Sequence, residues 1–293
     1  MLTKQQFLAQ LSDTPTLLDG ATGSNLIAAG MPMGCCSEAW ILSHPEALVT
    51  LQRAYARAGS RILYAPTFQA QPIALERVGL ANQTEAINAQ LVALSRSAAP
   101  DCLIAGNLTT LAAFTDSADP ANMDLLIENY ARQIRGLIDG GADLLVAETL
   151  MYPQEAEAIF VALQLEGGGA CLFSFVMQTD GSFLSGMDAV PVLQSLEEMG
   201  AAGLGFNCVA ADSFTGGLVS RLHRSVKVPL ICKPNAGLPY INEQKQAIYP
   251  MGPEEFAGIL TDCVSAGARL VGGCCGTTPA HIAAVKAALC PNA

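Results

Sequence analysis

The chain has 293 residues, of which 26 are acidic and 15 are basic, so its formal net charge is −11 at pH 7. Such an acidic protein repels polyphosphates, and a nucleic acid is therefore not an expected partner. Hydrophobic residues make up 51% of the chain, but the apolar runs fall well short of the roughly 20 residues that a membrane-spanning helix needs. We interpret these runs as strands buried on both faces and expect no membrane association.

The amino terminus and the cysteines indicate the compartment. No long apolar stretch follows Lys4, so we expect no signal peptide. The chain has ten cysteines, and in a protein without an export signal thiols serve metals or chemistry rather than crosslinks. We therefore predict a cytoplasmic protein.

Eight strand-like apolar runs recur along the chain, and a segment with helical periodicity follows each one. The predicted strands are 16–23, 60–67, 102–109, 143–150, 170–178, 203–209, 228–237 and 269–276. The predicted helices are 45–58, 84–98, 124–140, 153–165, 189–199, 213–224, 253–266 and 279–289. Eight such pairs without a break in composition predict a single-domain (β/α)8 TIM barrel over residues 1–293, with an open doubly wound sheet as the alternative.

The longest connections follow the first, second, third and seventh predicted strands. They cover residues 24–44, 68–83, 110–123 and 238–252. In a barrel these connections lie at the carboxyl ends of the strands, which is the end that carries the active site. We expect the functional residues there.

Two cysteine motifs end predicted strands at this same face. GFNC (205–208) ends the sixth strand and GGCCGTTP (272–279) ends the eighth, so the thiols of Cys208, Cys274 and Cys275 could converge. A structural zinc site usually has four protein ligands, often in C-x-x-C spacing, and the sequence contains no C-x-x-C. Three thiols beside a free fourth position are typical of a catalytic metal.

The type of metal and the turn between the adjacent cysteines also follow from the residues. Soft thiolates favour zinc, with copper(I) and iron as alternatives. Gly272, Gly273 and Gly276 would allow the sharp turn that lets adjacent cysteines bind one ion. The competing interpretation is that cysteines are small buried hydrophobes. We expect the remaining seven to be either buried in this way or incidental: Cys35, Cys36, Cys102, Cys171, Cys232, Cys263 and Cys290.

Four motifs taken together resemble the zinc-dependent homocysteine S-methyltransferases. They are LLDGATGS (17–24), ETL (148–150), GFNC (205–208) and VGGCCGTTP (271–279). A fifth motif, KPNAGLP (233–239), is most similar to the homocysteine-binding module of cobalamin-dependent methionine synthase. The resemblance covers nearly the whole chain and implies methyl transfer to the thiol of homocysteine, which gives methionine.

The resemblance also implies roles for individual residues. Cys208, Cys274 and Cys275 would bind Zn²⁺, and the substrate thiol would fill the fourth position, where coordination deprotonates it. Glu148 would accept a hydrogen bond from the substrate ammonium. The alternative for Glu148 is a carboxylate that caps a neighbouring loop or helix.

Four further residues are expected to contact the amino acid. Asp19 and Gly20 belong to the loop DGATG, whose amides we expect to hold the substrate carboxylate, while Asp19 fixes the ammonium or the loop. A plain turn is the competing interpretation of this loop. Thr67 and Asn207 are candidates for polar contacts with the substrate, and either could instead satisfy backbone groups at the strand ends.

The residues leave the methyl donor open. In methionine synthase a folate-binding barrel and a cobalamin domain follow this module, and the present chain ends at Ala293. The expected donors are therefore methylcobalamin on a partner domain or protein, S-methylmethionine, or a betaine. The alternative function is a module of a split or truncated methionine synthase that is inactive alone. A homocysteine-binding or metal-storage protein is a further hypothesis, and a thiol redox barrel is disfavoured because adjacent cysteines form strained disulfides.

Overall fold

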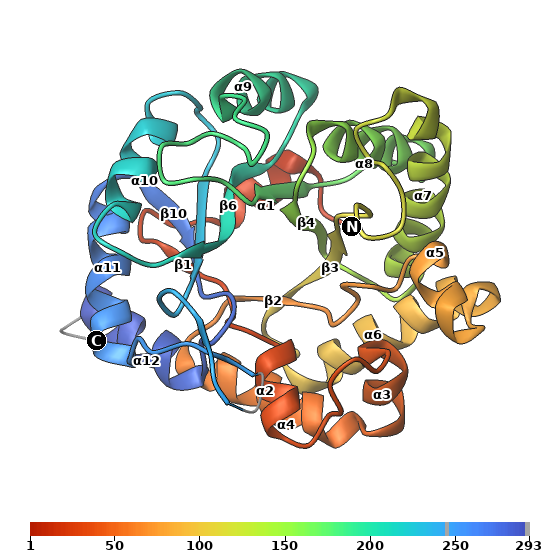
Figure 1. The fold of residues 1–293 in the computed structure, drawn as a ribbon, viewed down its shortest axis with the longest axis horizontal. Coiled ribbons are helices and arrows are strands. Elements are labelled where there is room, and N and C mark those ends of the chain that lie inside the picture. The colour runs from red at the N-terminus through yellow and green to blue at the C-terminus, as the bar shows by residue number, and fades with distance from the viewer. Residues whose placement is uncertain (244–245, 291–293) are drawn as a thin grey trace.

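The computed structural model describes residues 1–243 and 246–290, which form a barrel of parallel strands surrounded by helices (Figure 1). The eight strands are β1 (Thr16–Leu17), β2 (Ile62–Tyr64), β3 (Leu103–Thr109), β4 (Leu144–Leu150), β5 (Cys171–Phe175), β6 (Gly203–Ala210), β7 (Leu230–Asn235) and β10 (Ala268–Val271). They pair in the order β1-β10-β7-β6-β5-β4-β3-β2. A parallel bridge between Leu18 and Ile62 joins the end of β1 to β2, which are the two outermost strands of this order. The barrel is therefore closed, which confirms the predicted TIM barrel and excludes the open sheet.

Eight helices follow the barrel strands as predicted. They are α4 (Pro45–Ala58), α6 (Thr84–Ala98), α7 (Met123–Asp139), α8 (Pro153–Leu165), α9 (Ala189–Met199), α10 (Thr215–His223), α11 (Pro253–Ser265) and α12 (Pro279–Leu289). Local signals explain the agreement in their bounds. Proline occupies the first turn of α4, α8, α11 and α12, and the Asp188 side chain accepts a hydrogen bond from the Val190 amide at the start of α9.

Several shorter elements lie where the sequence predicts only loops. They are α2 (Gly23–Ala28), α3 (Ser37–Ser43), α5 (Pro72–Leu75), η1 (Glu76–Val78), η2 (Ala81–Gln83), η3 (Pro120–Asn122), β8 (Tyr240–Ile241) and β9 (Ala247–Ile248). The first predicted strand, 16–23, is also too long, because α2 already begins at Gly23. The predicted domain span of 1–293 includes residues 244–245 and 291–293, which lie outside the described residues.

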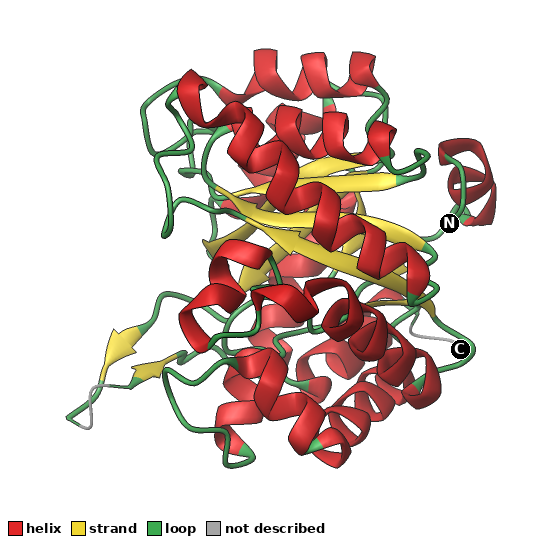
Figure 2. Ribbon diagram, turned by 90° about the vertical axis from the view of Figure 1, so that its right-hand side faces the viewer, coloured by secondary structure: helices red, strands yellow, loops and turns green. Residues whose placement is uncertain are grey.

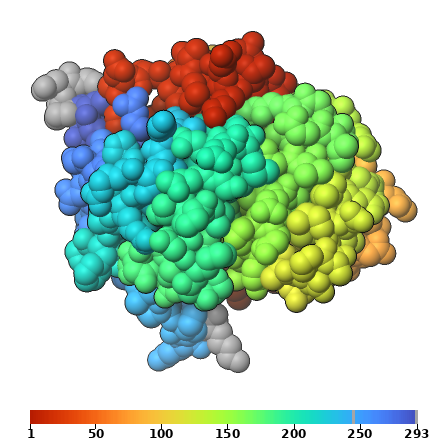
Figure 3. All heavy atoms as spheres, turned by 90° about the horizontal axis from the view of Figure 1, so that it is seen from above, coloured from red at the N-terminus to blue at the C-terminus, as the bar shows by residue number. Residues whose placement is uncertain are grey.

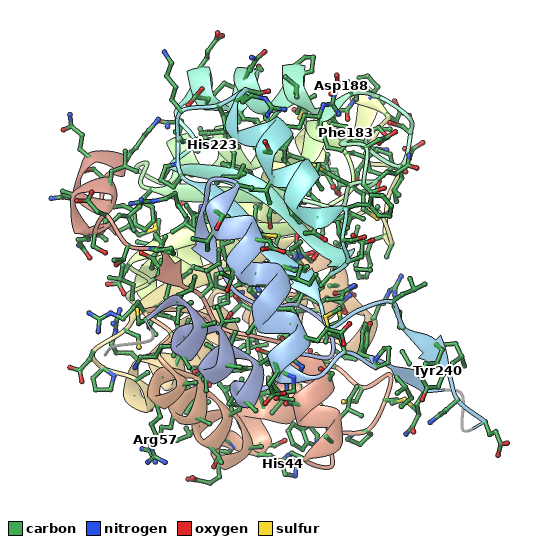
Figure 4. The ribbon with its side chains drawn as sticks, turned by 90° about the vertical axis from the view of Figure 1, so that its left-hand side faces the viewer. His44, Arg57, Phe183, Asp188, His223 and Tyr240 are labelled. Carbon is green, nitrogen blue, oxygen red and sulfur yellow. The ribbon has the colours of Figure 1, made fainter. Side chains whose placement is uncertain are left out.

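The two ends of the barrel are covered differently. Helix α1 (Lys4–Gln10) covers the amino ends of the strands, and the β8–β9 hairpin projects beyond the opposite, carboxyl end (Figures 2 and 3). Tyr240 marks this hairpin in Figure 4. None of the helices in the described part of the chain is both long and apolar enough to cross a membrane.

Helix α1 closes the amino end of the barrel with one aromatic side chain. Phe7 is fully buried and packs in the cluster that fills the barrel interior, together with Leu18, Ile62 and Leu172. The segment before the helix is fixed as well, since the Leu2 amide donates to the Asp143 carbonyl at 2.7 Å. The amino terminus is thus part of the barrel core rather than a loose extension.

Replacing Phe7 with alanine is expected to lower the free energy of unfolding by about 3 to 5 kcal/mol, because it empties the base of the barrel. Urea denaturation followed by circular dichroism measures this change. The control is Leu165→Ala at the exposed end of α8, which should change stability by less than about 0.5 kcal/mol. Equal effects of the two substitutions would contradict the role of α1.

Candidate active site

The three cysteines of the two motifs meet at the carboxyl end of the barrel. Cys208 lies on β6, and Cys274 and Cys275 follow β10, so strand β7 stands between them in the sheet. The Sγ atom of Cys208 lies 2.9 Å from that of Cys274 and 3.9 Å from that of Cys275, and the Sγ atoms of Cys274 and Cys275 are 4.0 Å apart. Among the described residues these sulfurs form a group that could hold a metal ion.

Hydrogen bonds hold the two adjacent cysteines in place. The Cys274 amide donates to the Pro234 carbonyl at 2.7 Å, and the Cys275 amide donates to Asn235 Oδ1 at 3.0 Å. Gly276 has a φ of 79°, a conformation that glycine adopts without strain. Gly272 has an ordinary φ, but a Cβ atom there would lie 2.6 Å from the Asp19 carbonyl oxygen. The glycines around the cysteines thus serve both the turn and the close packing.

The backbone is strained next to the sulfurs. Thr149 and Cys208 are the non-glycine residues with positive φ in the described chain, at 59° and 56°. Such conformations cost about 1 to 3 kcal/mol each and persist only where surrounding groups impose them. Asn207 is one of these groups: its Oδ1 accepts from the Thr149 amide at 2.8 Å and from Ser174 Oγ at 2.9 Å, and its Nδ2 donates to Thr149 Oγ1 at 2.7 Å.

A buried charge cluster lies beside the sulfurs. The Lys233 ammonium on β7 is 3.2 Å from Asp19 Oδ1 and 3.8 Å from Glu148 Oε2. The other carboxylate oxygens are held by the protein, because Asp19 Oδ2 accepts from the Tyr64 amide at 2.8 Å and Glu148 Oε1 accepts from Asn107 Nδ2 at 2.9 Å. The cluster joins the ends of β1, β2, β3, β4 and β7.

Burial dominates the acidity of this cluster. It raises the pKa of Asp19 to about 6, although the Lys233 charge opposes the shift. Burial also raises the pKa of Glu148, again against Lys233. The pKa of Lys233 rises well above its ordinary value, because the attraction of Asp19 and Glu148 outweighs the burial that acts in the opposite direction. One ammonium therefore only partly compensates two buried carboxylates.

The sulfurs and the charges face one cavity of about 270 Å³. This volume is close to the lower end of small-molecule sites, about 300 Å³. The residues that line it include Asp19, Gly20, Tyr64, Asn107, Glu148, Lys233, Cys208, Cys274 and Cys275. The structure thus brings together six of the predicted site residues: Asp19, Gly20, Glu148 and the three cysteines.

Gly20 is packed too tightly for a side chain. A Cβ atom at this position would lie 2.6 Å from Tyr55 Oη and 2.8 Å from Thr277 Oγ1. The loop after β1 is therefore fixed against α4 and the segment that carries the cysteines. The neighbouring Ala21 amide already donates to Thr277 Oγ1 at 3.1 Å.

Thr67 and Asn207 lie beneath the cavity rather than on its wall. Thr67 is fully buried; its Oγ1 donates to the Asn107 carbonyl at 2.8 Å and accepts from the Asn107 amide at 3.1 Å. Asn207 is fully buried too, and its amide group is occupied by Thr149 and Ser174. Both placements match the alternative in which these side chains satisfy groups at the strand ends.

The sequence interpretation missed Lys233, Tyr64 and Asn107 as site residues. The signal for Lys233 was a lone charge inside the apolar run of β7, since successive side chains of a strand alternate between faces. Cys232 is fully buried in the outer core between barrel and helices, so Lys233 points into the barrel. No comparable signal marked Tyr64 or Asn107, which depend on neighbouring strands.

Comparison with known proteins identifies relatives over nearly the full chain. The model of the family Homocysteine S-methyltransferase matches residues 16–289. A homocysteine S-methyltransferase of Escherichia coli is 32% identical over 297 residues, which cover 92% of this chain and 94% of the relative. The metallated crystal structure of the homocysteine methyltransferase MmuM from Escherichia coli matches with a TM-score of 0.81 at 29% identity and covers 97% of this chain and 99% of that one.

A longer relative matches only in part. A methionine synthase of Mycobacterium tuberculosis is 29% identical over 300 residues, which cover 95% of this chain but 25% of the relative. The chain thus spans about a quarter of the length of that protein.

Replacing Asn207 with alanine is expected to loosen the sulfur site, because the Thr149 amide and Ser174 hydroxyl lose their acceptor. Each buried donor left unpaired costs about 1 to 3 kcal/mol of stability. Loss of such a supporting hydrogen bond also lowers metal affinity by about 10- to 100-fold. Chelator competition and urea denaturation measure the two effects, with the exposed Asn82→Ala as control. Unchanged metal affinity would contradict the supporting role of Asn207.

The raised pKa of Asp19 predicts a pH dependence of stability. The folded chain binds the Asp19 proton more tightly than the unfolded chain, so protonation of Asp19 stabilises the fold. This stabilisation is fully present below about pH 3.8 and is lost as the pH rises through about 6. Asp19→Asn should remove it, so the variant should gain stability relative to the wild type between pH 5 and 7.5, by at most about 3 kcal/mol. Denaturation curves across this range, with exposed Asp262→Asn as control, test the sign. A parallel pH dependence of wild type and Asp19→Asn would show that Asp19 does not titrate there.

Proposed function

Because the chain belongs to the homocysteine S-methyltransferase family and is therefore a methyltransferase, we propose that it methylates the thiol of homocysteine at a zinc site. The ligands are Cys208, Cys274 and Cys275, and the product is methionine. One observation carries the proposal: one sulfur from β6 and two from the segment after β10 converge beside two buried carboxylates in a single small cavity. This arrangement matches a substrate that has a thiol at one end and an ammonium at the other.

The donor set fits zinc. Zn–S bonds of about 2.3 Å in a tetrahedron separate the sulfurs by roughly 3.8 Å. Two of the sulfur separations, 3.9 and 4.0 Å, are close to this value. The third, between Cys208 and Cys274, is 2.9 Å, so these two sulfurs must move apart by roughly 1 Å to reach the tetrahedral distance. When bound, zinc supplies a Lewis acid that favours the thiolate form of a fourth sulfur ligand.

The residues of the chain orient the amino acid. Asp19 and Glu148 accept hydrogen bonds from the substrate ammonium, and the loop at Gly20 lies beside the substrate carboxylate. Orientation of the thiol toward the donor contributes to the rate by holding the reacting atoms in line. In the transfer the thiolate sulfur forms the new bond to the methyl carbon, and the donor leaves with the electron pair of the broken bond.

Thr67 and Asn207 support these groups from below. Thr67 fixes the backbone of Asn107, which in turn donates to Glu148. Asn207 holds Thr149 in its strained conformation and approaches Cys274 Sγ with its Nδ2 at 3.8 Å. We therefore assign both residues positioning roles in place of direct substrate contacts.

A second candidate function is a module that receives the methyl group from methylcobalamin on another domain or protein. It is supported by the similarity to methionine synthase over a quarter of that protein. Exposed apolar side chains also lie on the connections at the carboxyl end, where a large donor carrier would approach: Met33, Leu184, Phe214, Leu238 and Ile241.

The metal assignment predicts that purified protein holds about one zinc ion per chain. Cys274→Ala and Cys275→Ala should each lose both the zinc and methionine formation, whereas Cys290→Ala, at the end of α12, should keep both. Elemental analysis and a methionine assay provide the measurements. Full zinc occupancy in either of the first two variants would disprove the ligand set.

The donor is identified by comparing S-methylmethionine, betaine and protein-bound methylcobalamin in the same assay. Turnover with either small donor supports a self-contained enzyme. Turnover with protein-bound methylcobalamin alone supports the module. Homocysteine binding without turnover under any condition would contradict both candidate functions.

A further inference from the structure

The Lys233 ammonium is buried without a full set of hydrogen-bond partners. An ammonium has three protons to donate, and the contacts at 3.2 Å to Asp19 and 3.8 Å to Glu148 are its ion pairs with the described residues. Its remaining neighbour is the face of the Tyr64 ring, whose centroid is 4.4 Å away. The side chain is only 4% exposed, so bulk water does not complete its shell. At least one proton is left for a ligand in the cavity.

Acceptors with incomplete hydrogen bonding belong to residues that line the same cavity. Asp19 Oδ1 and Glu148 Oε2 are the oxygens that pair with the Lys233 ammonium, and neither they nor Asn107 Oδ1 accept a hydrogen bond of normal geometry from the described residues. The ammonium and the oxygens thus keep capacity for further hydrogen bonds side by side. A ligand that carries both an ammonium and a carboxylate on one carbon atom satisfies both kinds of group.

We propose that Lys233 Nζ binds the α-carboxylate of the substrate amino acid while Asp19 and Glu148 bind its α-ammonium. This inference rests on the proposed function and adds the residue that selects thiols with a free carboxylate. Each charge then has a neighbour of opposite sign, because the substrate ammonium lies next to the protein carboxylates and the substrate carboxylate lies next to the lysine. Lys233 acts as a binding and specificity-determining residue and not as a proton carrier.

The position of Lys233 in the barrel supports this role. Its backbone is paired with Asn207 of β6, so the ammonium is attached to the same rigid strand pair that carries Cys208. An ion pair buried at this depth contributes little to stability and is often replaceable by apolar residues without loss. Ligand binding gives the buried lysine a function that stability alone does not supply.

The inference is tested with zinc-loaded protein and two matched ligands at pH 7.0, below the α-amino pKa of about 7.7. Homocysteine and homocysteinamide share the thiol and the ammonium, but the amide lacks the carboxylate charge. Isothermal titration calorimetry should show that the wild type binds homocysteine about 10- to 100-fold more tightly than homocysteinamide, which is the range for one charge-assisted hydrogen bond. Equal affinity of the wild type for both ligands would overturn the inference.

Lys233→Met is expected to lower the affinity for homocysteine by the same factor and to change the affinity for homocysteinamide by less than about 3-fold. Lys233→Arg should restore part of the discrimination, since it keeps the charge, and the exposed Lys227→Met should behave as the wild type. Equal weakening of both ligands by Lys233→Met would show that the lysine acts only through the fold or the carboxylates. If Lys233→Met does not fold, the affinities of the wild type and of Lys233→Arg for the two ligands decide whether the lysine recognises the carboxylate.

Failure of the proposed function gives a different result. A zinc-loaded wild type that binds neither ligand would overturn the homocysteine assignment itself, and the role of Lys233 with it. A wild type that binds homocysteine but does not distinguish it from the amide overturns the role of Lys233 alone.

Discussion

Closure of the barrel is the constraint on which the site depends. Closure places the end of β1 beside β2, so that Asp19 Oδ2 accepts a hydrogen bond from the Tyr64 amide. In the same sheet β6 and β10 stand on either side of β7, and Cys208 and Cys274, 66 positions apart in sequence, bring their sulfurs to 2.9 Å. The same register pairs Asn207 with Lys233. Strand β7, which carries the lysine of the charge cluster, therefore stands between the two strands that position the metal site.

The site also concentrates features that oppose folding. Two buried carboxylates share one ammonium, and Thr149 and Cys208 hold left-handed backbone conformations. Each of these features costs free energy of order 1 kcal/mol or more. The apolar clusters inside and around the barrel offset that cost, since Phe7 and its neighbours fill the amino end away from the chemistry. Stability and function are thus separated along the barrel axis.

The sequence predicted those parts of the fold that local chemistry specifies. Proline in the first turn and Asp188 at the start of α9 mark helix ends without reference to other strands. Helices α2 and α3 escaped prediction because they are short and no side-chain cap marks their starts. At the site, the cysteine motifs were informative because three thiols at strand ends, without C-x-x-C spacing, indicate a metal with an open position. The supporting role of Asn207 was not predictable, because its partners come from other strands.

The size of the cavity constrains the methyl donor. About 270 Å³ lies near the lower limit for small-molecule sites, so a substrate and a donor that share the cavity must both be small. A corrinoid is far too large to enter and must present its methyl group from outside, against the loops that carry Phe214 and Leu238. The two candidate functions thus predict different environments for these exposed apolar side chains during methyl transfer. They remain in water with a small donor and are covered by the carrier of a corrinoid.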